Sequence, residues 1–351
     1  MIYRDDSGRY IGHDESNEIG YKRVLPGDFV VHLRSFQGGF AHSQYEGITS
    51  PAYTVFRAKE PTSHSDRFWK HWFMSEHFIA GLSTVTYGIR DGRSISVDEF
   101  MNTFLAFPAV EEQAAISRLF DYLDDLITLH QRKYDKLVIF KKSMLEKMFP
   151  KDGESVPEIR FAGFTDPWEQ RKLGDYVVVS TAKNADGRFN KEDVLSVSGE
   201  YGIVNQIAFQ GRSFAGSSVL NYGIVNTGDI VYTKSPLNSN PYGIIKVNKG
   251  IPGIVSTLYA VYRPQDNVHT NFIQVYFEQH ERMNNYMHPL VNKGAKNDMK
   301  VTAENALKGV VTFPSREEPV IISEFFDRLD SLITLHQRKR LSIRQRSPVW
   351  S

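Results

Sequence analysis

The stretch FDYLDDLITLHQRK at residues 120–133 returns as FDRLDSLITLHQRK at residues 326–339. Only two positions differ, and the copies are 206 residues apart. Solenoid proteins repeat every 20 to 50 residues or so, so an offset of this size is that of a whole domain. The sequence therefore predicts two related domains, each followed by the same helix.

The same offset extends upstream of the helix. Residues 47–57 (GITSPAYTVFR) align with residues 253–263 (GIVSTLYAVYR), and Phe107 aligns with Phe313. Further upstream, PGDFV at residue 26 aligns with TGDIV at residue 227 only at an offset of 201, so five residues were gained or lost in between. Such a change falls in a loop, where related domains usually differ in function.

Composition sets broad limits. The chain has 351 residues, of which 41% are hydrophobic and 24% charged, enough for two ordinary domains. It has no cysteine, which excludes disulfides and thiolate metal sites and fits a reducing, cytoplasmic location. No signal peptide or membrane span is predicted. The net charge is +1 and the pI about 7.9, so any nucleic-acid binding must use local basic patches.

The duplicated helix carries apolar residues at alternating spacings of four and three. This pattern predicts packing along a partner helix. The first copy runs from about Glu111 to Phe149, before Pro150, which is about 39 residues or roughly 58 Å. We expect the two copies to pack on each other as an antiparallel coiled coil and to place the two domains at opposite ends. The alternative is that each helix covers its own domain. The expected helix-pair interface consists of Ile116, Phe120, Leu123, Ile127, Tyr134, Leu137, Ile322, Phe326, Leu329, Ile333 and Ile343.

Each domain has a mixed α/β (α+β) pattern. Strands are expected at residues 193–198, 224–234, 242–247, 253–262 and 309–313, because these segments are rich in β-branched and aromatic residues and are bounded by Gly and Pro. A helix is expected at residues 270–283, with a first-copy counterpart at residues 66–78. Its aromatic residues favour a core position over base stacking.

Several blocks together resemble one family. The segment PEIRFAGFTDPWEQRKLGD at residues 157–175, the GDIV strand, EEQAAI at residues 111–116, the LITLHQRK helix and MLEKMFP ending at Pro150 are similar to the specificity subunit of type I restriction-modification enzymes. The resemblance covers nearly the whole chain. It implies target-recognition domains at residues 1–109 and 157–315, with linking helices at residues 110–150 and 316–346.

The resemblance also implies a function. Such subunits are not enzymes: they bind double-stranded DNA, each domain recognises half of a bipartite target, and helix length sets the gap between the halves. Two methylation subunits and two restriction subunits are the expected partners. No cofactor is expected on this chain, because S-adenosylmethionine, ATP and Mg belong to the partner subunits. No first-copy equivalent of the segment at residue 157 is present, and Pro348 stands where the first helix continues, so we expect a partial first domain and a shortened last helix.

Loops that differ between the two copies are the candidates for base recognition. Arg and Lys suit guanine, Asn and Gln suit adenine, and other basic groups contact phosphates. The predicted DNA-binding residues are Arg34, Gln37, Arg90, Arg93, Lys234, Ser235, Asn238, Asn240, Tyr242, Lys293, Lys296, Asn297 and Lys300. The alternative for each loop is a solvated turn.

Two other functions stay open. The helices could assemble partners without DNA recognition, which would make the chain an interaction scaffold or an inactive specificity subunit. A stand-alone methyltransferase or nuclease is disfavoured: NSNPY at residues 238–242 lacks the second proline of the NPPY motif, and no glycine-rich cofactor turn precedes it. The sequence also lacks the phosphate-binding GxxxxGK[ST] loop and the HExxH and GxSxG motifs.

Overall fold

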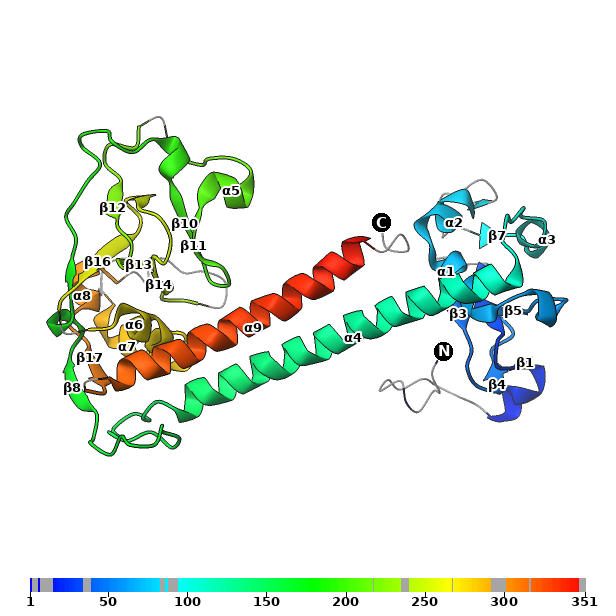
Figure 1. The fold of residues 1–351 in the computed structure, drawn as a ribbon, viewed down its shortest axis with the longest axis horizontal. Helices are drawn as coiled ribbons and strands as arrows, with labels where there is room; N and C mark the ends of the chain where they lie inside the picture. Colours follow the sequence, from blue (N-terminus) through cyan, green and yellow to red (C-terminus); the bar gives the residue numbers. More distant parts are fainter. Residues whose placement is uncertain are drawn as a thin grey trace. The chain divides into compact units, whose positions relative to one another are not determined.

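The computed structural model describes residues 1, 6, 15–33, 39–82, 86–87, 94–216, 218–234, 240–266, 268–291, 301–315 and 317–346, and for residues 15–17, 86, 87, 94 and 346 the backbone alone. The chain forms two compact units (Figure 1). Unit 1 consists of Met1–Tyr134 and Thr334–Ser351, and unit 2 of Asp135–Ile333. Two long helices, α4 (Val110–Lys147) and α9 (Glu318–Arg346), are each divided between the units.

In its described residues, unit 1 contains short antiparallel sheets and three short α-helices in addition to its part of α4 and α9. The strands pair as β1–β4, β3–β2–β5 and β6–β7. The elements are η2 (Glu15–Gly20), β1 (Lys22–Val24), β2 (Phe29–Val31), β3 (Ala41–His42), β4 (Gly47–Thr49), β5 (Thr54–Phe56), η4 (Pro61–Ser63), α1 (Asp66–Met74), α2 (Glu76–Gly81), β6 (Thr86–Tyr87), β7 (Ser94–Ile95) and α3 (Val97–Met101).

Unit 2 is built around the sheet β14–β13–β16–β9, with the pairs β12–β15, β10–β11 and β17–β8 beside it. Helix α6 packs against β14 of this sheet (Figure 1). The elements are β8 (Glu169–Lys172), η6 (Leu173–Asp175), β9 (Val177–Val179), η7 (Lys191–Asp193), β10 (Leu195–Ser198), β11 (Gly202–Asn205), α5 (Gln206–Gln210), β12 (Gly223–Val225), β13 (Ile230–Tyr232), β14 (Ile245–Val247), β15 (Gly253–Val255), β16 (Ala260–Pro264), α6 (Thr270–Phe277), α7 (His280–Met287), η8 (His288–Leu290), α8 (Ala303–Ala306) and β17 (Val310–Phe313).

The two units share a pattern of strand pairing. Strand β1 pairs with β4, and β2 with β5, all antiparallel; in unit 2 the corresponding strands pair as β12 with β15 and β13 with β16. Helices α1 and α2 follow β5, as α6 and α7 follow β16. The mixed α/β character expected from the sequence is therefore present in both units.

Several predicted elements are interrupted. The helix expected at residues 270–283 is two helices, α6 and α7, with extended backbone at Gln279. Its counterpart is also two helices, because the Ser75 hydroxyl accepts from the Phe78 amide and donates to the Trp72 carbonyl. The strands expected at residues 224–234 and 253–262 are each broken by a turn, which in the first case contains Gly228 at φ 89°. These polar turns lie inside apolar runs, where periodicity alone does not locate them.

The core of unit 2 includes part of both long helices. Phe326 and Leu329 of α9 are buried in the same cluster as Leu145 of α4 and Phe149 just beyond its end. The Phe149 and Phe326 ring centroids are 6.1 Å apart. Nζ of Lys141 lies 2.6 Å from Oδ1 of Asp330. Later residues of α4 thus contact earlier residues of α9, so the helices are antiparallel in unit 2, as expected.

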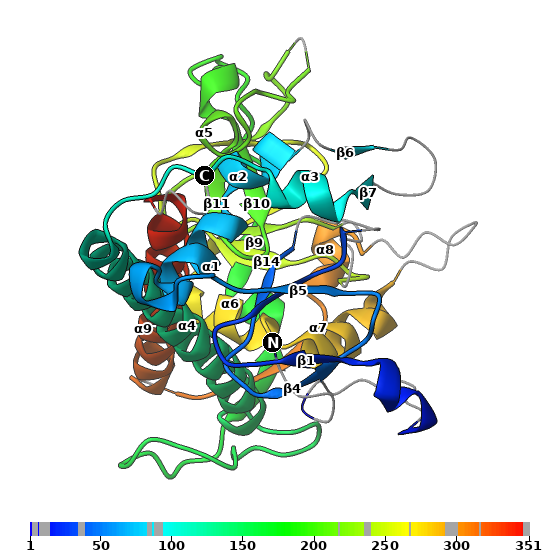
Figure 2. The ribbon, with the colours of Figure 1, turned by 90° about the vertical axis from the view of Figure 1, so that its right-hand side faces the viewer.

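In unit 1, the start of α4 packs on α1 (Figure 2). Ile116 contacts the aromatic core of this unit, and the Phe120 ring lies 5.2 Å from His71. Both residues were expected at the helix pair, so the expectation has to be corrected: the first turns of each helix also cover their own domain. Further along α4, Nδ1 of His130 is 2.8 Å from Nδ1 of His336 in α9.

None of the helices in the described part of the chain is long and apolar enough to span a membrane. Within the same residues, no three His, Cys, Asp or Glu side chains gather as a metal site would require.

Candidate nucleic-acid interface

Most of the predicted DNA-binding residues lie outside the described residues: Arg34, Gln37, Arg90, Arg93, Ser235, Asn238, Lys293, Lys296, Asn297 and Lys300. Lys234, Asn240 and Tyr242 are described. They flank the undescribed part of the loop between β13 and β14 in unit 2. The corresponding loop in unit 1 follows β2.

Lys234 has an unusual backbone. Its φ of 57° makes it the one non-glycine residue with a positive φ in the described part of the chain. Such a conformation is rare for a residue with a side chain and is found more often at functional sites. It follows the buried strand β13, and its Nζ donates to the Thr257 carbonyl at 3.2 Å. This hydrogen bond holds the Lys234 side chain at the end of the sheet, next to the start of the loop.

The charge environment of Lys234 is also distinctive. Partial burial lowers the pKa of its ammonium group, the nearby Lys183 lowers it further, and Glu304 raises it. Two like charges held close together are stabilised by an anion that binds both. The charge of Lys183 thus acts on Lys234, and we call these two residues the lysine pair.

Lys183 was not among the residues predicted from the sequence. It lies about fifty positions before Lys234, at an isolated bridge to Gly223, and its side chain is exposed. No local motif marks it, and only the strand pairing of unit 2 brings it near the loop. Two further exposed arginines of unit 2, Arg188 and Arg212, lie over the neighbouring rings of Phe189 and Phe214 at 5.0 and 4.6 Å from the ring centroids.

The other two described residues support the loop. Asn240 is half-buried, and its carbonyl accepts a hydrogen bond from the Gly243 amide at 3.0 Å. Tyr242 is 7% exposed, its hydroxyl is 2.8 Å from Nδ1 of His288, and its carbonyl accepts from the Tyr232 hydroxyl. The expected DNA contact of Tyr242 has to be corrected, because its ring belongs to the core of unit 2. The presence of a tyrosine in the sequence does not distinguish the two roles, because its ring can pack in a core or stack on a DNA base.

The helix-pair residues are placed more fully. Ile322, Phe326 and Leu329 are buried in the core of unit 2, and Leu137 packs against that core. The remaining predicted positions of the pair, Leu123, Ile127, Tyr134, Ile333 and Ile343, are half-buried. In unit 1, the Arg340 guanidinium donates to the Gln131 side chain. The assignment of all these positions to one helix-pair interface stays a prediction.

An ionic network ties the helices to the domain in unit 2. Lys141 of α4 contacts Glu278 at 2.7 Å and Asp330 of α9 at 2.6 Å, and Lys246 of β14 contacts Glu278 at 3.1 Å. Burial alone would raise the pKa of Glu278, but the two lysines lower it to about 2. The charged form of Glu278 is therefore strongly stabilised in the fold.

A homologous position anchors the helix in both units. Asp121 of α4 accepts from His71 at 3.0 Å and lies 3.4 Å from Arg67 and Lys70 of α1. Its repeat counterpart, Asp327, accepts from Asn271 of α6 at 3.1 Å and contacts Lys249. The aspartate of the repeated FD pair therefore fixes each long helix to its own domain.

No protein-family model matches the sequence, and the search of curated proteins finds no match either. Among solved structures, the HsdS subunit from Thermoanaerobacter tengcongensis aligns with a TM-score of 0.46 at 15% identity, over 91% of this chain and 76% of that chain. A structure concerning complex assembly and conformational transition of the type I R-M system aligns with a TM-score of 0.48 at 14% identity, over 92% and 80%.

The type I restriction-modification system S subunit from M. genitalium aligns with a TM-score of 0.52 at 12% identity, over 91% of this chain and 80% of that chain. The chain therefore shares its fold with the M. genitalium S subunit.

Proposed function

We propose that the chain is the DNA sequence-recognition subunit of a type I restriction-modification complex. Each unit would contact one half of a bipartite target, and methylation and restriction subunits would supply the chemistry, with their cofactors, in the cytoplasm. The observation that carries the proposal is the combination of two repeated α/β units with paired long helices, in the fold of an S subunit.

The lysine pair supports DNA contact by unit 2. A duplex presents a dense row of phosphates, and protein ammonium groups that neutralise them release bound counterions. The charge of Lys183 lowers the pKa of Lys234, and the side chain of Lys183 is exposed. A phosphate between them would remove this repulsion. The loop that begins at Lys234 would then meet the base edges in the adjacent groove.

Differences between the units support recognition of two unlike half-sites. The loop after β13 begins with KSPLNSNPY in unit 2, and the loop after β2 contains RSFQGGF in unit 1. Both loops follow a central strand of the local sheet, β13 or β2. Related scaffolds with unlike loops at the same position suit proteins that recognise different sequences.

Exposed apolar residues on the long helices support partner docking. On α4, Tyr122 in unit 1 is 61% exposed and Ile139 in unit 2 is 68% exposed. On α9, Leu332 and Leu335 are each 43% exposed. Apolar side chains in such number outside a core are typical of protein interaction surfaces. The same observation favours the second candidate function, a scaffold that assembles partners without DNA recognition.

Salt-dependent duplex binding by the purified full chain separates these two functions. We expect log affinity to fall linearly with log salt concentration, and Lys183→Ala with Lys234→Ala to reduce the slope by about 0.9 for each phosphate that the protein no longer neutralises. Lys151→Ala is the matched control, because this lysine is exposed in the segment after α4. Absence of duplex binding, or equal slopes for the pair and the control, would favour the scaffold.

A further inference from the structure

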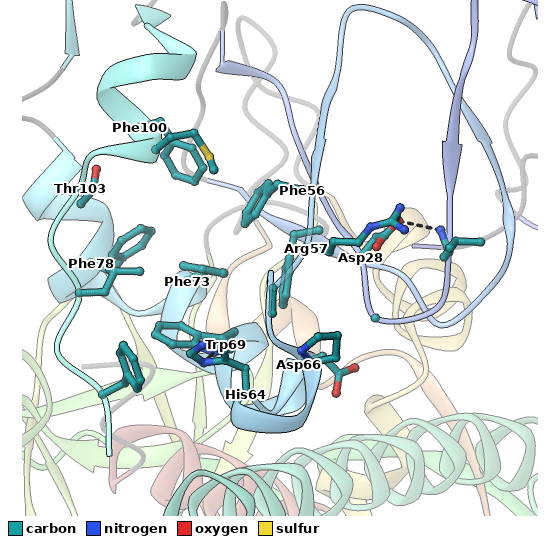
Figure 3. Close-up of a pocket in the computed structure, with 18 of the residues that line it drawn as sticks. Asp28, Phe56, Arg57, His64, Asp66, Trp69, Phe73, Phe78, Phe100 and Thr103 are labelled. Carbon is teal, nitrogen blue, oxygen red and sulfur yellow. Dashed lines mark hydrogen bonds and ion pairs between the residues drawn. The ribbon is translucent and has the colours of Figure 1, made fainter. Parts of the chain in front are cut away.

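Unit 1 contains an apolar pocket of about 630 Å³ (Figure 3). Its wall is formed by the rings of Phe56, Trp69, Phe73, Phe78 and Phe100, which come from β5, α1, α2 and α3. Asp28, Arg57, His64 and Asp66 supply its polar lining. A pocket of this size and lining is large enough for several apolar side chains.

The repeat relation shows what covers the corresponding surface in unit 2. There, β8 pairs with β17, and β9 pairs with β16, both antiparallel. The backbone amides of Leu173 and Gly174 donate to the carbonyls of Gly309 and Leu307, each at 3.0 Å. The Tyr176 ring lies 4.9 Å from Phe313. Leu173, Tyr176 and Val177 are all buried in the core cluster of unit 2. We call residues 168–179 the covering segment.

The counterparts of these partners in unit 1 are uncovered. Phe107 corresponds to Phe313, yet Phe107 is 51% exposed where Phe313 is 2% exposed. Residues 103–109 correspond to the β17 region but belong to no strand, and β5, the counterpart of β16, pairs with β2 alone among the described strands. Met101, Thr103 and Phe107 line the pocket. Among the described residues, β5 thus lacks the second strand partner that β16 has in unit 2, residues 103–109 lack the strand partner that β17 has, and both segments line an apolar pocket.

We propose that unit 1 binds an extended segment of another polypeptide in the manner in which unit 2 holds its covering segment. One strand of the bound segment would pair with residues 103–107 and the next with β5, and apolar side chains between them would fill the pocket. The occupant is a peptide with an aromatic or branched apolar residue at the positions of Trp168, Leu173, Tyr176 and Val177. This mode of binding takes affinity from main-chain hydrogen bonds and specificity from side-chain pockets. The proposal does not depend on DNA recognition.

A synthetic peptide with the sequence of residues 157–181 is a direct probe, because it carries the whole covering segment. Fluorescently labelled peptide titrated with the full chain is expected to bind saturably with a Kd below about 100 μM. Hydrogen exchange is expected to slow at residues 54–58 and 103–107 when the peptide is added. A peptide carrying Leu173→Asp and Tyr176→Asp should not bind.

Adjacent phenylalanines of unit 1 provide a matched pair of chain variants. Phe107 lines the pocket, whereas Phe104 is 91% exposed and does not. Phe107→Asp is expected to weaken peptide binding at least about tenfold, as loss of a buried interface aromatic does, and Phe104→Asp to leave it within about twofold. If circular dichroism shows that Phe107→Asp unfolds, Met101→Asp replaces it, because Met101 lines the pocket and is 56% exposed.

Several outcomes would overturn the proposal. The first is absence of saturable peptide binding, and the second is an equal effect of the two phenylalanine variants on binding. The third is slower hydrogen exchange at residues 260–264 and 307–313, which would mean that the peptide replaces the covering segment of unit 2. Protection of residues 103–107 that rises with chain concentration and without peptide would identify a second copy of the chain as the occupant. Binding of small apolar molecules but not of the peptide would identify a ligand pocket.

Discussion

At the residue scale, one tight turn illustrates how the repeat specifies structure. Gly27 and Gly228 have φ of 90° and 89°, a region that residues with a side chain rarely adopt. The carboxylates of Asp28 and Asp229 each accept a hydrogen bond at 2.8 Å from the amide three residues earlier, Leu25 or Asn226. The Gly-Asp pair therefore turns the chain into strands β2 and β13, which carry the candidate DNA loops.

The first prediction concerns this turn. Gly228→Ala is expected to lower the free energy of unfolding by about 1 kcal/mol or more, because alanine is strained at positive φ. Gly199→Ala is the control: a Cβ there meets open space, and its φ lies outside the positive range. Urea unfolding of both variants measures the difference. Equal stability would show that the turn tolerates a side chain.

The second prediction concerns the aspartate that anchors α4. Asp121→Ala removes the acceptor of His71 and the partner of Arg67 and Lys70, and hydrogen bonds to charged groups contribute about 1.5–3 kcal/mol. We expect a loss at the lower end of that range, because Arg67 is largely exposed. Asp125→Ala, an exposed position on the same helix, should have little effect on the thermal midpoint.

At the element scale, the sequence predicted strand and helix positions better than their ends. The alternating spacing of apolar residues predicted two long helices, because this periodicity persists over several turns. It did not locate the breaks at Ser75, whose hydroxyl caps α2, and at Gln279, whose backbone is extended. Nor did it identify Lys183, which approaches Lys234 only through strand pairing.

The third prediction uses the network around Glu278. Its pKa in the fold, about 2, is below its ordinary value of 4.5. The stabilisation it provides is therefore complete above about pH 4.5 and is lost as the pH falls toward 2. Glu278→Gln should reduce stability near pH 7 by up to about 3–5 kcal/mol, because Lys141 and Lys246 lose their shared partner.

Chemical unfolding at pH 7 and pH 3 tests this dependence. The difference between Glu278→Gln and the unaltered chain should shrink at pH 3. Glu281→Gln, an exposed glutamate at the start of α7, should follow the unaltered chain at both values. A constant difference across this pH range would mean that Glu278 does not stabilise the fold through its charge.

At the scale of the whole molecule, the duplication is the basis of the functional proposal. Each unit repeats the strand pairs, the helix pair and the long helix, but carries its own loop sequence. A repeated scaffold with unlike loops suits a bipartite, asymmetric target. The fold class was predictable from the duplicated motif, whereas the exposed pocket of unit 1 became evident only when the two units were compared in three dimensions.

The fourth prediction concerns the gap between half-sites. Insertion of one heptad into each long helix, at the level of His130 and His336, keeps the apolar seam in register. It lengthens each helix by about 10.5 Å, or roughly three base pairs of duplex. The preferred gap between half-sites should increase by that amount. A heptad of matched composition added after residue 346 should leave the gap unchanged.

Selection of bound duplexes from a random DNA library by the full chain would decide whether the two units together recognise one bipartite target. We predict an enriched motif with two short defined parts separated by a gap of constant length. Lys234→Ala with Lys183→Ala should weaken its selection. Enrichment of a single continuous motif, or of none under conditions in which the chain is folded, would be incompatible with recognition of two half-sites.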